Sequence, residues 1–324
     1  MAAEAGHTVV VAGRNRARLE KLATDVNASD VRIFDLTSEE SMRAALVGTD
    51  VVVSCVGPFT RFGLPVARAA IATGTPYVDT CGEPRFCEEL LVESATAESP
   101  LITAIGGASL LADLATATAL RHIPDPRRVT LAYRIAAMRP SRGTLGSEVA
   151  MIADGAVVIR GRELTRLPAG GIPAGLPDGR GVRFPVPDAV VISRYCTPNE
   201  CDAYLVSSYP WIVGPSIRAA AIACSAPGAR RLLEALASRS PSMDDGRPHG
   251  RFTVLADVDG QTVSATADDV YGFTANAAIH VAEACARTRT TGLRAASQIV
   301  DDIDSTARHL GVRIDVETSS RQIQ

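Results

Sequence analysis

The chain has 324 residues, a formal net charge of -3 and 46% hydrophobic residues, of which few are aromatic. Its length allows two domains, because a single hydrophobic core stops growing at about 250 to 300 residues. The small negative charge excludes the strong positive field that attracts nucleic acids and anionic membranes, so we expect neither as a partner and expect a small-molecule substrate instead.

Strand and helix patterns alternate through the first 123 residues. We expect strands at 7–12, 30–34, 51–55, 77–79 and 101–104, and helices at 14–26, 37–46, 64–73, 84–96 and 110–121. The run from Val51 to Cys55 is unbroken and β-branched, which indicates a strand buried on both faces of a parallel sheet. The alternation predicts a Rossmann-like, doubly wound parallel sheet in an α/β protein.

From residue 124 the pattern becomes α+β. A hairpin over 251–267, with Asp259 and Gly260 at its turn, predicts an antiparallel sheet. We also expect strands at 128–135, 156–160 and 312–316, helices at 143–154, 212–238, 271–287 and 293–310, a loop at 167–187 and a mobile segment at 238–250. We therefore divide the chain into a dinucleotide-binding domain (1–123), an α+β substrate domain (124–290) whose sheet would offer a homodimer face, and a C-terminal helix and strand (291–324) that pack back on the first domain.

Ligands of open parallel sheets bind beyond the carboxyl ends of the strands. The turn Cys55-Val56-Gly57-Pro58 lies at such an end and would contact the pyrophosphate and nicotinamide of a dinucleotide, because glycine permits close approach and Pro58 fixes φ. We interpret Cys55 as a small buried residue rather than a nucleophile, since no basic residue is near it in sequence.

Three further residues are candidates for catalysis. Asp79 and Glu83 follow the strand at 77–79 and would orient a substrate or transfer a proton. Glu83 fits the first turn of a helix equally well. Tyr271, at the start of a later helix, could reach the cleft or could simply pack in the core.

The turn after the first strand in the chain predicts NADP(H) as the cofactor. Gly13, Arg14 and Asn15 stand where a dinucleotide fold holds the adenine ribose, and an arginine there accommodates the 2′-phosphate. Asp35 and Leu36 would lie on the adenine side. The alternative for Arg14 is an exposed residue at a helix start, where the helix dipole does not favour its charge.

The Gly-rich phosphate loop of this fold should lie about 20 residues before such an arginine, and Met1 is too close to Arg14 to leave room for it. We therefore expect an N-terminally truncated sheet that lacks its first strand. Three arrangements remain open: a true start upstream of Met1, direct pairing of the strands at 7–12 and 51–55, or another segment between them.

Seven cysteines without a C-x-x-C pair, and a start without a basic targeting region, predict reduced thiols in the cytoplasm. No apolar run approaches the roughly 18 residues of a membrane span. We expect no metal site, because the five histidines are isolated and Cys196 and Cys201 have no further ligands nearby.

The ligand edge resembles the saccharopine dehydrogenase-like family, including its trans-acting enoyl reductase branch. The resemblance rests on AGRN after a strand, on GTLGSEVAMI, and on a middle segment with family-like residues at Cys55, Gly57, Pro58, Gly63, Pro65, Val66, Gly74, Tyr77, Asp79, Gly82 and Glu83. Weaker similarities follow at Gly143-Thr144, at Tyr271 with Thr274-Ala275, and over 292–316.

The resemblance implies an NADP(H)-dependent oxidoreductase that transfers hydride to or from an imine, an amine or an activated carbon–carbon double bond of a small metabolite. The chain departs from the family pattern in lacking the first strand with its G-x-x-G-x-x-G loop, and in having Gly106 to Asp113 where relatives often have G-F-D-x-x-P. The alternative is a non-redox member that has lost cofactor binding and serves as a small-molecule binding protein, a non-redox biosynthetic enzyme or a scaffold for a partner enzyme.

Overall fold

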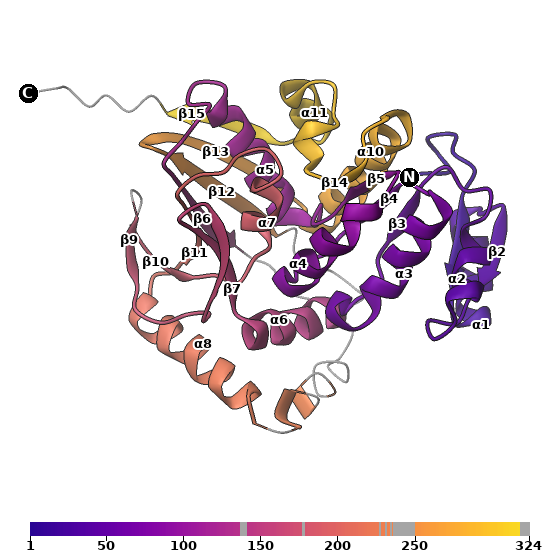
Figure 1. Ribbon diagram of the computed structural model, residues 1–324, viewed down its shortest axis with the longest axis horizontal. Coiled ribbons are helices and arrows are strands. Elements are labelled where there is room, and N and C mark those ends of the chain that lie inside the picture. The colour runs from indigo at the N-terminus through magenta and orange to yellow at the C-terminus, as the bar shows by residue number, and fades with distance from the viewer. Residues whose placement is uncertain are drawn as a thin grey trace, which may run out of the picture.

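A computed structural model describes residues 1–136, 141–176, 179–226, 228–230, 232, 233, 235 and 250–317 (Figure 1). At its centre is a four-stranded parallel sheet of order β14-β5-β4-β3. Its strands are β3 (Val52–Ser54), β4 (Tyr77–Asp79), β5 (Pro100–Ile102) and β14 (Gly292–Arg294). The helices packed around it are α3 (Phe59–Thr73), α4 (Pro84–Glu93), α5 (Gly107–Leu120) and α10 (Val270–Arg287).

A separate two-stranded parallel sheet pairs β1 (Val10–Gly13) with β2 (Asp30–Ile33). Its helix, α1 (Arg16–Val26), buries none of its residues. The chain continues through α2 (Glu39–Leu46), which packs on α3 and connects this unit to the central sheet. In Figure 1 the unit lies at the right-hand end of the molecule, and β1 pairs with β2 but not with β3.

A nine-stranded mixed sheet dominates the other half. Its order is β15-β13-β12-β6-β11-β10-β9, with β7 and β8 attached beside β11, and only β6 and β11 pair in parallel within it. The strands are β6 (Arg128–Ala136), β7 (Ala156–Arg160), β8 (Glu163–Leu167), β9 (Ala174–Leu176), β10 (Gly179–Arg183), β11 (Glu200–Val206), β12 (Arg251–Val258), β13 (Gln261–Asp268) and β15 (Arg313–Glu317). The remaining helices are α6 (Arg142–Asp154), α7 (Asp188–Ile192), α8 (Pro210–Cys224) and α11 (Ile303–His309), with short 3₁₀ turns at Ser94–Thr96 and Ala296–Gln298.

Helix α5 lies between the two large sheets. Nearly all its residues are buried, as expected for a helix that is apolar on every side. It starts close to β4, because a Cβ at Gly106 would lie 2.6 Å from the carbonyl oxygen of Thr80. Gly106 and Gly107 therefore allow close packing at the start of α5. The buried residues of α5 belong to one hydrophobic core that is shared by the two halves of the described structure.

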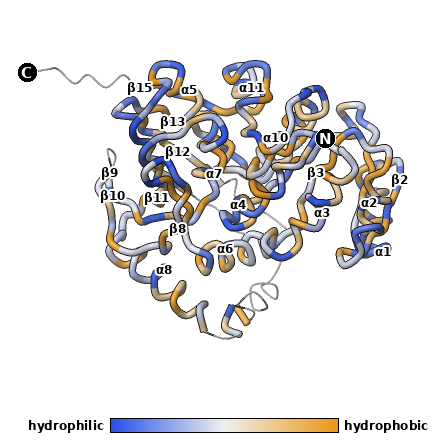
Figure 2. The backbone as a smooth tube through the Cα atoms, in the orientation of Figure 1, coloured by the Kyte–Doolittle hydropathy of each residue, from blue (hydrophilic) through white to orange (hydrophobic). Residues whose placement is uncertain are grey.

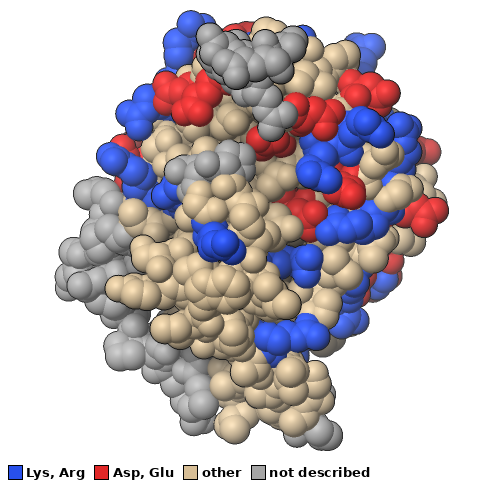
Figure 3. Space-filling view, turned by 90° about the vertical axis from the view of Figure 1, so that its left-hand side faces the viewer, with Lys and Arg blue, Asp and Glu red and all other residues tan. Residues whose placement is uncertain are grey.

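Surface charge is mixed. Figure 3 shows acidic and basic residues interspersed on the face that carries β9, β10 and α8, next to a wide uncharged area. Figure 2 shows hydrophobic residues along α8, and Trp211, Ile212 and Ile222 of this helix are exposed. None of the helices in the described part of the chain has the length and hydropathy of a membrane span.

The α/β fold class is confirmed: a parallel sheet in the N-terminal half and a mixed, mostly antiparallel second sheet. Two element predictions are wrong. The segment expected to be a loop at 167–187 contains the strands β9 and β10, whose glycines are more typical of loops. Gly181 is needed in β10 because a Cβ there would lie 2.8 Å from the Cβ of Tyr204. The helix expected at 293–310 begins instead as β14, because Leu293 pairs with Leu101 of the parallel sheet. After a short 3₁₀ turn at Ala296–Gln298, α-helix occurs only in α11.

The predicted domain boundaries stay a prediction. The C-terminal residues divide between the halves, since β14 joins the parallel sheet and β15 pairs with β13 of the large sheet. Most of the segment expected to be mobile, 238–250, lies outside the described residues.

Candidate functional site

The predicted nicotinamide turn, Cys55 to Pro58, joins the carboxyl end of β3 to α3 and contains a cis peptide bond between Gly57 and Pro58. Helix α6 covers this turn closely. A Cβ at Gly57 would lie 3.8 Å from Ser147 Oγ, and one at Gly146 would lie 3.7 Å from Pro58 Cγ. The turn therefore contacts α6 on one side, while Cys55 and Gly57 remain exposed.

Glu83 holds the turn in place. Its carboxylate is fully buried and accepts hydrogen bonds from the backbone N–H groups of Phe59 (2.7 Å) and Thr60 (2.8 Å). It also accepts hydrogen bonds from the hydroxyls of Thr60 (2.6 Å) and Ser147 (2.8 Å). Pro58 at the N-cap of α3 provides no side-chain cap, so Glu83 satisfies the free N–H groups of that helix end.

Asp79 lies behind the turn and is also fully buried. One carboxylate oxygen accepts from the N–H groups of Cys81 (2.9 Å) and Ala104 (3.0 Å) and from the hydroxyl of Thr103 (2.9 Å). The other oxygen has no hydrogen-bond partner within the described structure. Desolvation raises the pKa of Asp79 to about 6, although these hydrogen bonds oppose the rise. Asp79 is therefore a buried group next to Cys55 of the turn, and its negative charge contributes to a raised pKa of the Cys55 thiol, which is caused mainly by desolvation.

Arg14 lies at the same edge. Its guanidinium is 5.8 Å from the centroid of the Phe62 ring on α3, and that of Arg61 is 4.8 Å from the same centroid. Neither arginine forms a salt bridge within the described residues, so their two positive charges can both attract an anion. Gly13 ends β1, and the side chain of Asn15 caps α1.

Asp35 and Leu36 lie beyond β2. Asp35 is exposed and accepts hydrogen bonds from the N–H (2.9 Å) and hydroxyl (2.8 Å) of Thr37, and these bonds lower its pKa. Leu36 is partly buried against the core. Asp35 thus forms a local turn, and its second oxygen remains available to an adenosine.

Tyr271 holds the start of α6. Its hydroxyl accepts a hydrogen bond from the N–H of Ser141 (2.8 Å) and lies 3.1 Å from Thr144 Oγ1. Tyr271 and Glu83 therefore fix two points of the same helix, one at its N-cap and one at Ser147. This arrangement favours positioning roles for both residues, and their participation in catalysis stays a prediction.

The interpretation of Cys55 as a buried residue is wrong, because β3 ends at Ser54 and Cys55 lies on the exposed turn beyond it. Sequence reasoning also missed Arg61, Phe62 and Ser147. The first two lie inside the family-like middle segment, where only their position on α3 beside Arg14 indicates a role. In the described part of the chain, no three His, Cys, Asp or Glu side chains lie together in a way that could hold a metal ion.

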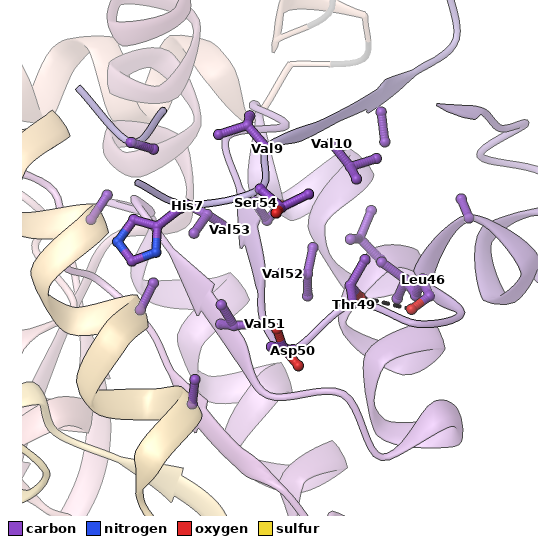
Figure 4. A pocket seen from close by; sticks show the side chains of 18 of the residues that line it. His7, Val9, Val10, Leu46, Thr49, Asp50, Val51, Val52, Val53 and Ser54 are labelled. Atoms are coloured by element: carbon purple, nitrogen blue, oxygen red, sulfur yellow. Dashed lines mark hydrogen bonds between the residues drawn. The ribbon is translucent and has the colours of Figure 1, made fainter. Parts of the chain in front are cut away.

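A groove of about 650 Å³ separates β1 from β3. Figure 4 shows Val9 and Val10 on one side of it and Val51, Val52 and Val53 on the other. The two strands do not pair directly, which excludes one of the three arrangements expected for the truncated sheet.

The residues at this edge fit the two ends of a dinucleotide but not its middle. Arg14 and Arg61 suit the 2′-phosphate of the adenosine, and the Gly57-Pro58 turn suits the nicotinamide. A pyrophosphate requires a Gly-rich turn before a helix N-terminus. No strand-to-helix turn at this edge has the G-x-G-x-x-G sequence, and the groove lies where such a turn would begin.

Comparisons with known proteins agree with this geometry. Residues 1–105 match the model of the saccharopine dehydrogenase NADP binding domain. A trans-acting enoyl reductase of Mycobacterium leprae is 31% identical over 127 residues, which are 37% of this chain and 30% of that protein. A saccharopine dehydrogenase-like oxidoreductase of Rattus norvegicus is 34% identical over 93 residues, 26% of this chain and 22% of that protein. The matches thus span less than a third of each of these relatives.

One solved structure shares the overall fold. The apo, histidine-tagged saccharopine dehydrogenase (L-Glu forming) of Saccharomyces cerevisiae aligns over 96% of this chain and 94% of its own, with a TM-score of 0.55 at 14% identity. At that identity the likeness establishes the fold alone. Residues 1–105 are thus similar to the saccharopine dehydrogenase NADP binding domain, and the described chain shares the overall fold of the yeast saccharopine dehydrogenase.

Proposed function

We propose that the protein is an NADP(H)-dependent reductase that acts on an imine or an activated carbon–carbon double bond of a small metabolite. The observation that carries the proposal is the pair Arg14 and Arg61, which flank the ring of Phe62 without an acidic partner in the described structure. Two unpaired guanidinium groups beside a dinucleotide edge favour a phosphate ligand, because each can form bidentate hydrogen bonds to it.

The nicotinamide would lie against the Gly57-Pro58 turn. The bound cofactor supplies the hydride, and the protein positions the reacting groups and excludes water. Glu83 fixes the turn through four hydrogen bonds, and α6 covers it through Gly146 and Ser147. We place the substrate at the exposed side of the turn, beside Cys55 and Gly57, with Tyr271 holding the start of α6.

The names of two relatives, a trans-acting enoyl reductase and a saccharopine dehydrogenase-like oxidoreductase, support this substrate class. Reduction of an enoyl group adds hydride to a C=C bond, and a dehydrogenase that acts on an amine removes hydride to give an imine, so both reactions interconvert a polarised double bond and its reduced form. Asp79 is fully buried behind the turn, and its part in the proton transfer of the reaction stays a prediction.

A second candidate is a non-redox protein that binds a small molecule. The groove between β1 and β3 favours it, because the described residues provide no pyrophosphate site. The two candidates differ in whether NADPH binds at all.

Calorimetric titration with NADPH and NADH tests the proposal. We expect tighter binding of NADPH, and we expect Arg14→Ala to weaken NADPH binding about tenfold while leaving NADH binding nearly unchanged, since a charged hydrogen bond contributes roughly 1.5–3 kcal/mol. Arg16→Ala is the matched control, because Arg16 is exposed and forms a salt bridge with Glu20 instead. Equal losses for both cofactors would show that Arg14 does not contact the 2′-phosphate, and no binding of either cofactor by the folded chain would favour the non-redox candidate.

A further inference from the structure

Helix α8 exposes an apolar face that no other part of the described structure covers. The helix is apolar on nearly every side, and Arg218 is its one charged residue. A helix of this composition is normally buried all round. Here, however, Trp211, Ile212 and Ile222 are 60%, 66% and 64% exposed. The composition of α8 therefore predicts a covering that the described chain does not supply.

The exposed residues of α8 lie together on one side of the helix. At 3.6 residues per turn they cover an arc of about 160°, and they are residues 211, 212, 215, 216, 218, 219, 222 and 223. The opposite side packs against β10 and α6. On that side Gly214 lies so close to the loop before β9 that a Cβ would collide with the carbonyl oxygen of Gly171. The helix is thus held firmly by one side and presents the other to its surroundings.

Two neighbouring residues extend the apolar face. Tyr209, the N-cap residue of α8, is 70% exposed. Ile172 is 87% exposed and follows Gly171, whose N–H donates a hydrogen bond to the carbonyl of Gly214 in α8 at 3.0 Å. Exposed apolar patches of this kind mark sites of contact with proteins or membranes. The α8 patch is defined as Ile172, Tyr209, Trp211, Ile212 and Ile222.

Two arginines border the α8 patch. The guanidinium of Arg180 in β10 lies 5.5 Å from the centroid of the Trp211 ring, and Arg218 is exposed on α8 itself. Neither forms a salt bridge within the described residues, and the stretch 207–226 contains no acidic residue. Figure 3 shows isolated basic side chains in the uncharged area of this face. The patch is therefore locally positive, although the whole chain has a net charge of -3.

A second copy of the chain fits the α8 patch poorly. In a two-fold symmetric dimer the same surface of each copy faces its equivalent. Arg218 stands next to the middle of α8, so two such helices packed face to face would bring their arginines together. Like charges in an interface disfavour association, and the helix has no acidic residue to compensate. The charges thus favour an anionic partner over a copy of the same chain.

A bilayer with anionic headgroups matches both features of the α8 patch. Tryptophan and tyrosine are enriched at the membrane–water interface, because their rings enter the apolar region while their polar ends stay in water. Arginines at the rim attract the phosphates of anionic lipids. With 15 residues, α8 is shorter than the roughly 20 residues that a membrane span needs. It would therefore lie along the surface of the bilayer.

We propose that the α8 patch docks the protein on a membrane surface that contains anionic phospholipids. The apolar side chains of the patch enter the headgroup region, and Arg180 and Arg218 contact the lipid phosphates. Since α8 packs on α6, and α6 contacts the Gly57-Pro58 turn, docking places that turn one helix layer from the lipid. The expectation that the protein has no membrane partner rested on the net charge of the whole chain, which does not describe this face.

The fluorescence of Trp211 tests the proposal directly, because Trp211 is the single tryptophan of the chain. The probe is a vesicle of phosphatidylglycerol and phosphatidylcholine in equal amounts, mixed with the 324-residue chain without any cofactor. We expect the emission to shift to shorter wavelength and brominated acyl chains to quench it. Vesicles of phosphatidylcholine alone should bind at least about tenfold more weakly, because each arginine near an anionic surface strengthens binding about fivefold.

Four variants separate the apolar from the electrostatic part of the docking. Ile212→Glu should abolish vesicle binding, whereas Val92→Glu, at a 75% exposed position on α4, should bind like the unaltered chain. Arg218→Gln should weaken binding to the mixed vesicles about fivefold and leave binding to pure phosphatidylcholine unchanged. Arg308→Gln is its matched control, because Arg308 is exposed on α11, which lies away from α8 in Figure 1.

Three results would overturn the proposal. The first is an unchanged Trp211 emission with both kinds of vesicle, and the second is equal binding to both kinds. The third is a shift that appears without vesicles as the protein concentration rises, together with a doubled mass in light scattering, which would assign the α8 patch to a second copy. Since none of these measurements involves NADPH, their failure is distinct from a failure of the proposed reductase activity.

Discussion

Replacing Glu83 by alanine should destabilise the protein far more than its single charge suggests. The substitution leaves the N–H groups of Phe59 and Thr60 without an acceptor at the start of α3. Each unsatisfied buried donor costs about 1–3 kcal/mol, so the free energy of unfolding should fall by roughly 2–5 kcal/mol. The hydroxyls of Thr60 and Ser147 lose their acceptor too, but they can rotate toward other oxygens.

Urea unfolding followed by circular dichroism measures this loss. Glu83→Gln should give an intermediate value of about 1–2 kcal/mol, because the amide keeps one acceptor and loses the favourable charge at the helix N-terminus. The control is Glu89→Ala in α4, the helix that follows Glu83. Glu89 forms a partly exposed ion pair with Arg85, so the expected loss of stability is below about 1 kcal/mol. If Glu83→Ala and Glu89→Ala reduce stability equally, Glu83 does not cap α3 and the account of the turn given above is wrong.

Three further predictions concern the same region. The native pKa of Asp79 is raised from 3.8 to about 6, so its contribution to stability is greatest below pH 4 and falls by about 3 kcal/mol as the pH rises through 6. Asp79→Asn should remove that part of the pH dependence. Urea unfolding of both proteins between about pH 4 and 7 measures the difference. Gly63→Ala should destabilise by about 1–3 kcal/mol, since its Cβ would lie 2.5 Å from the Phe86 ring, whereas Gly146→Ala should be neutral or stabilising; equal thermal midpoints would contradict this. Tyr271→Phe should cost about 0.5–1.5 kcal/mol and increase amide exchange at the start of α6, and unchanged exchange there would show that Tyr271 does not hold that helix.

The sequence predicts most reliably the helices and strands that have a clear local pattern of apolar residues. The strand at Tyr77 is a short apolar run between helices, and it is buried throughout in the parallel sheet. The prediction that the strand beginning at Val51 is buried on both faces is wrong, because β3 lies at the edge of its sheet in the described structure and Val53 is 39% exposed. Three-residue β14 could not be found in this way, because only its pairing with β5 distinguishes Leu293 from the start of a helix. The edge strands β9 and β10 contain glycines that typically indicate loops.

The site was predicted in outline rather than in detail. The alternation of strands and helices predicts that the Gly57-Pro58 turn follows a strand end. It also predicts that Arg14, which follows the strand β1, lies near the same end of the fold, and its contact with Phe62 of α3 agrees with this. The partners of Glu83 lie 23 to 64 residues away in sequence, so no local pattern reveals that its carboxylate is a cap. The exposure of Cys55 depends on where β3 ends, and strand ends are the least certain part of a sequence-based prediction.

The pairing of β14 with β5 also determines when the parallel sheet can form. Gly292 pairs with Pro100, so the edge of the sheet closes only after nearly the whole chain has left the ribosome. Until then the newly made N-terminal half exposes the unpaired edge of β5, an edge that other chains can bind. Folding of this half is therefore non-local and slow to complete, and a chain that stops before residue 292 should aggregate rather than persist as an independent cofactor-binding domain.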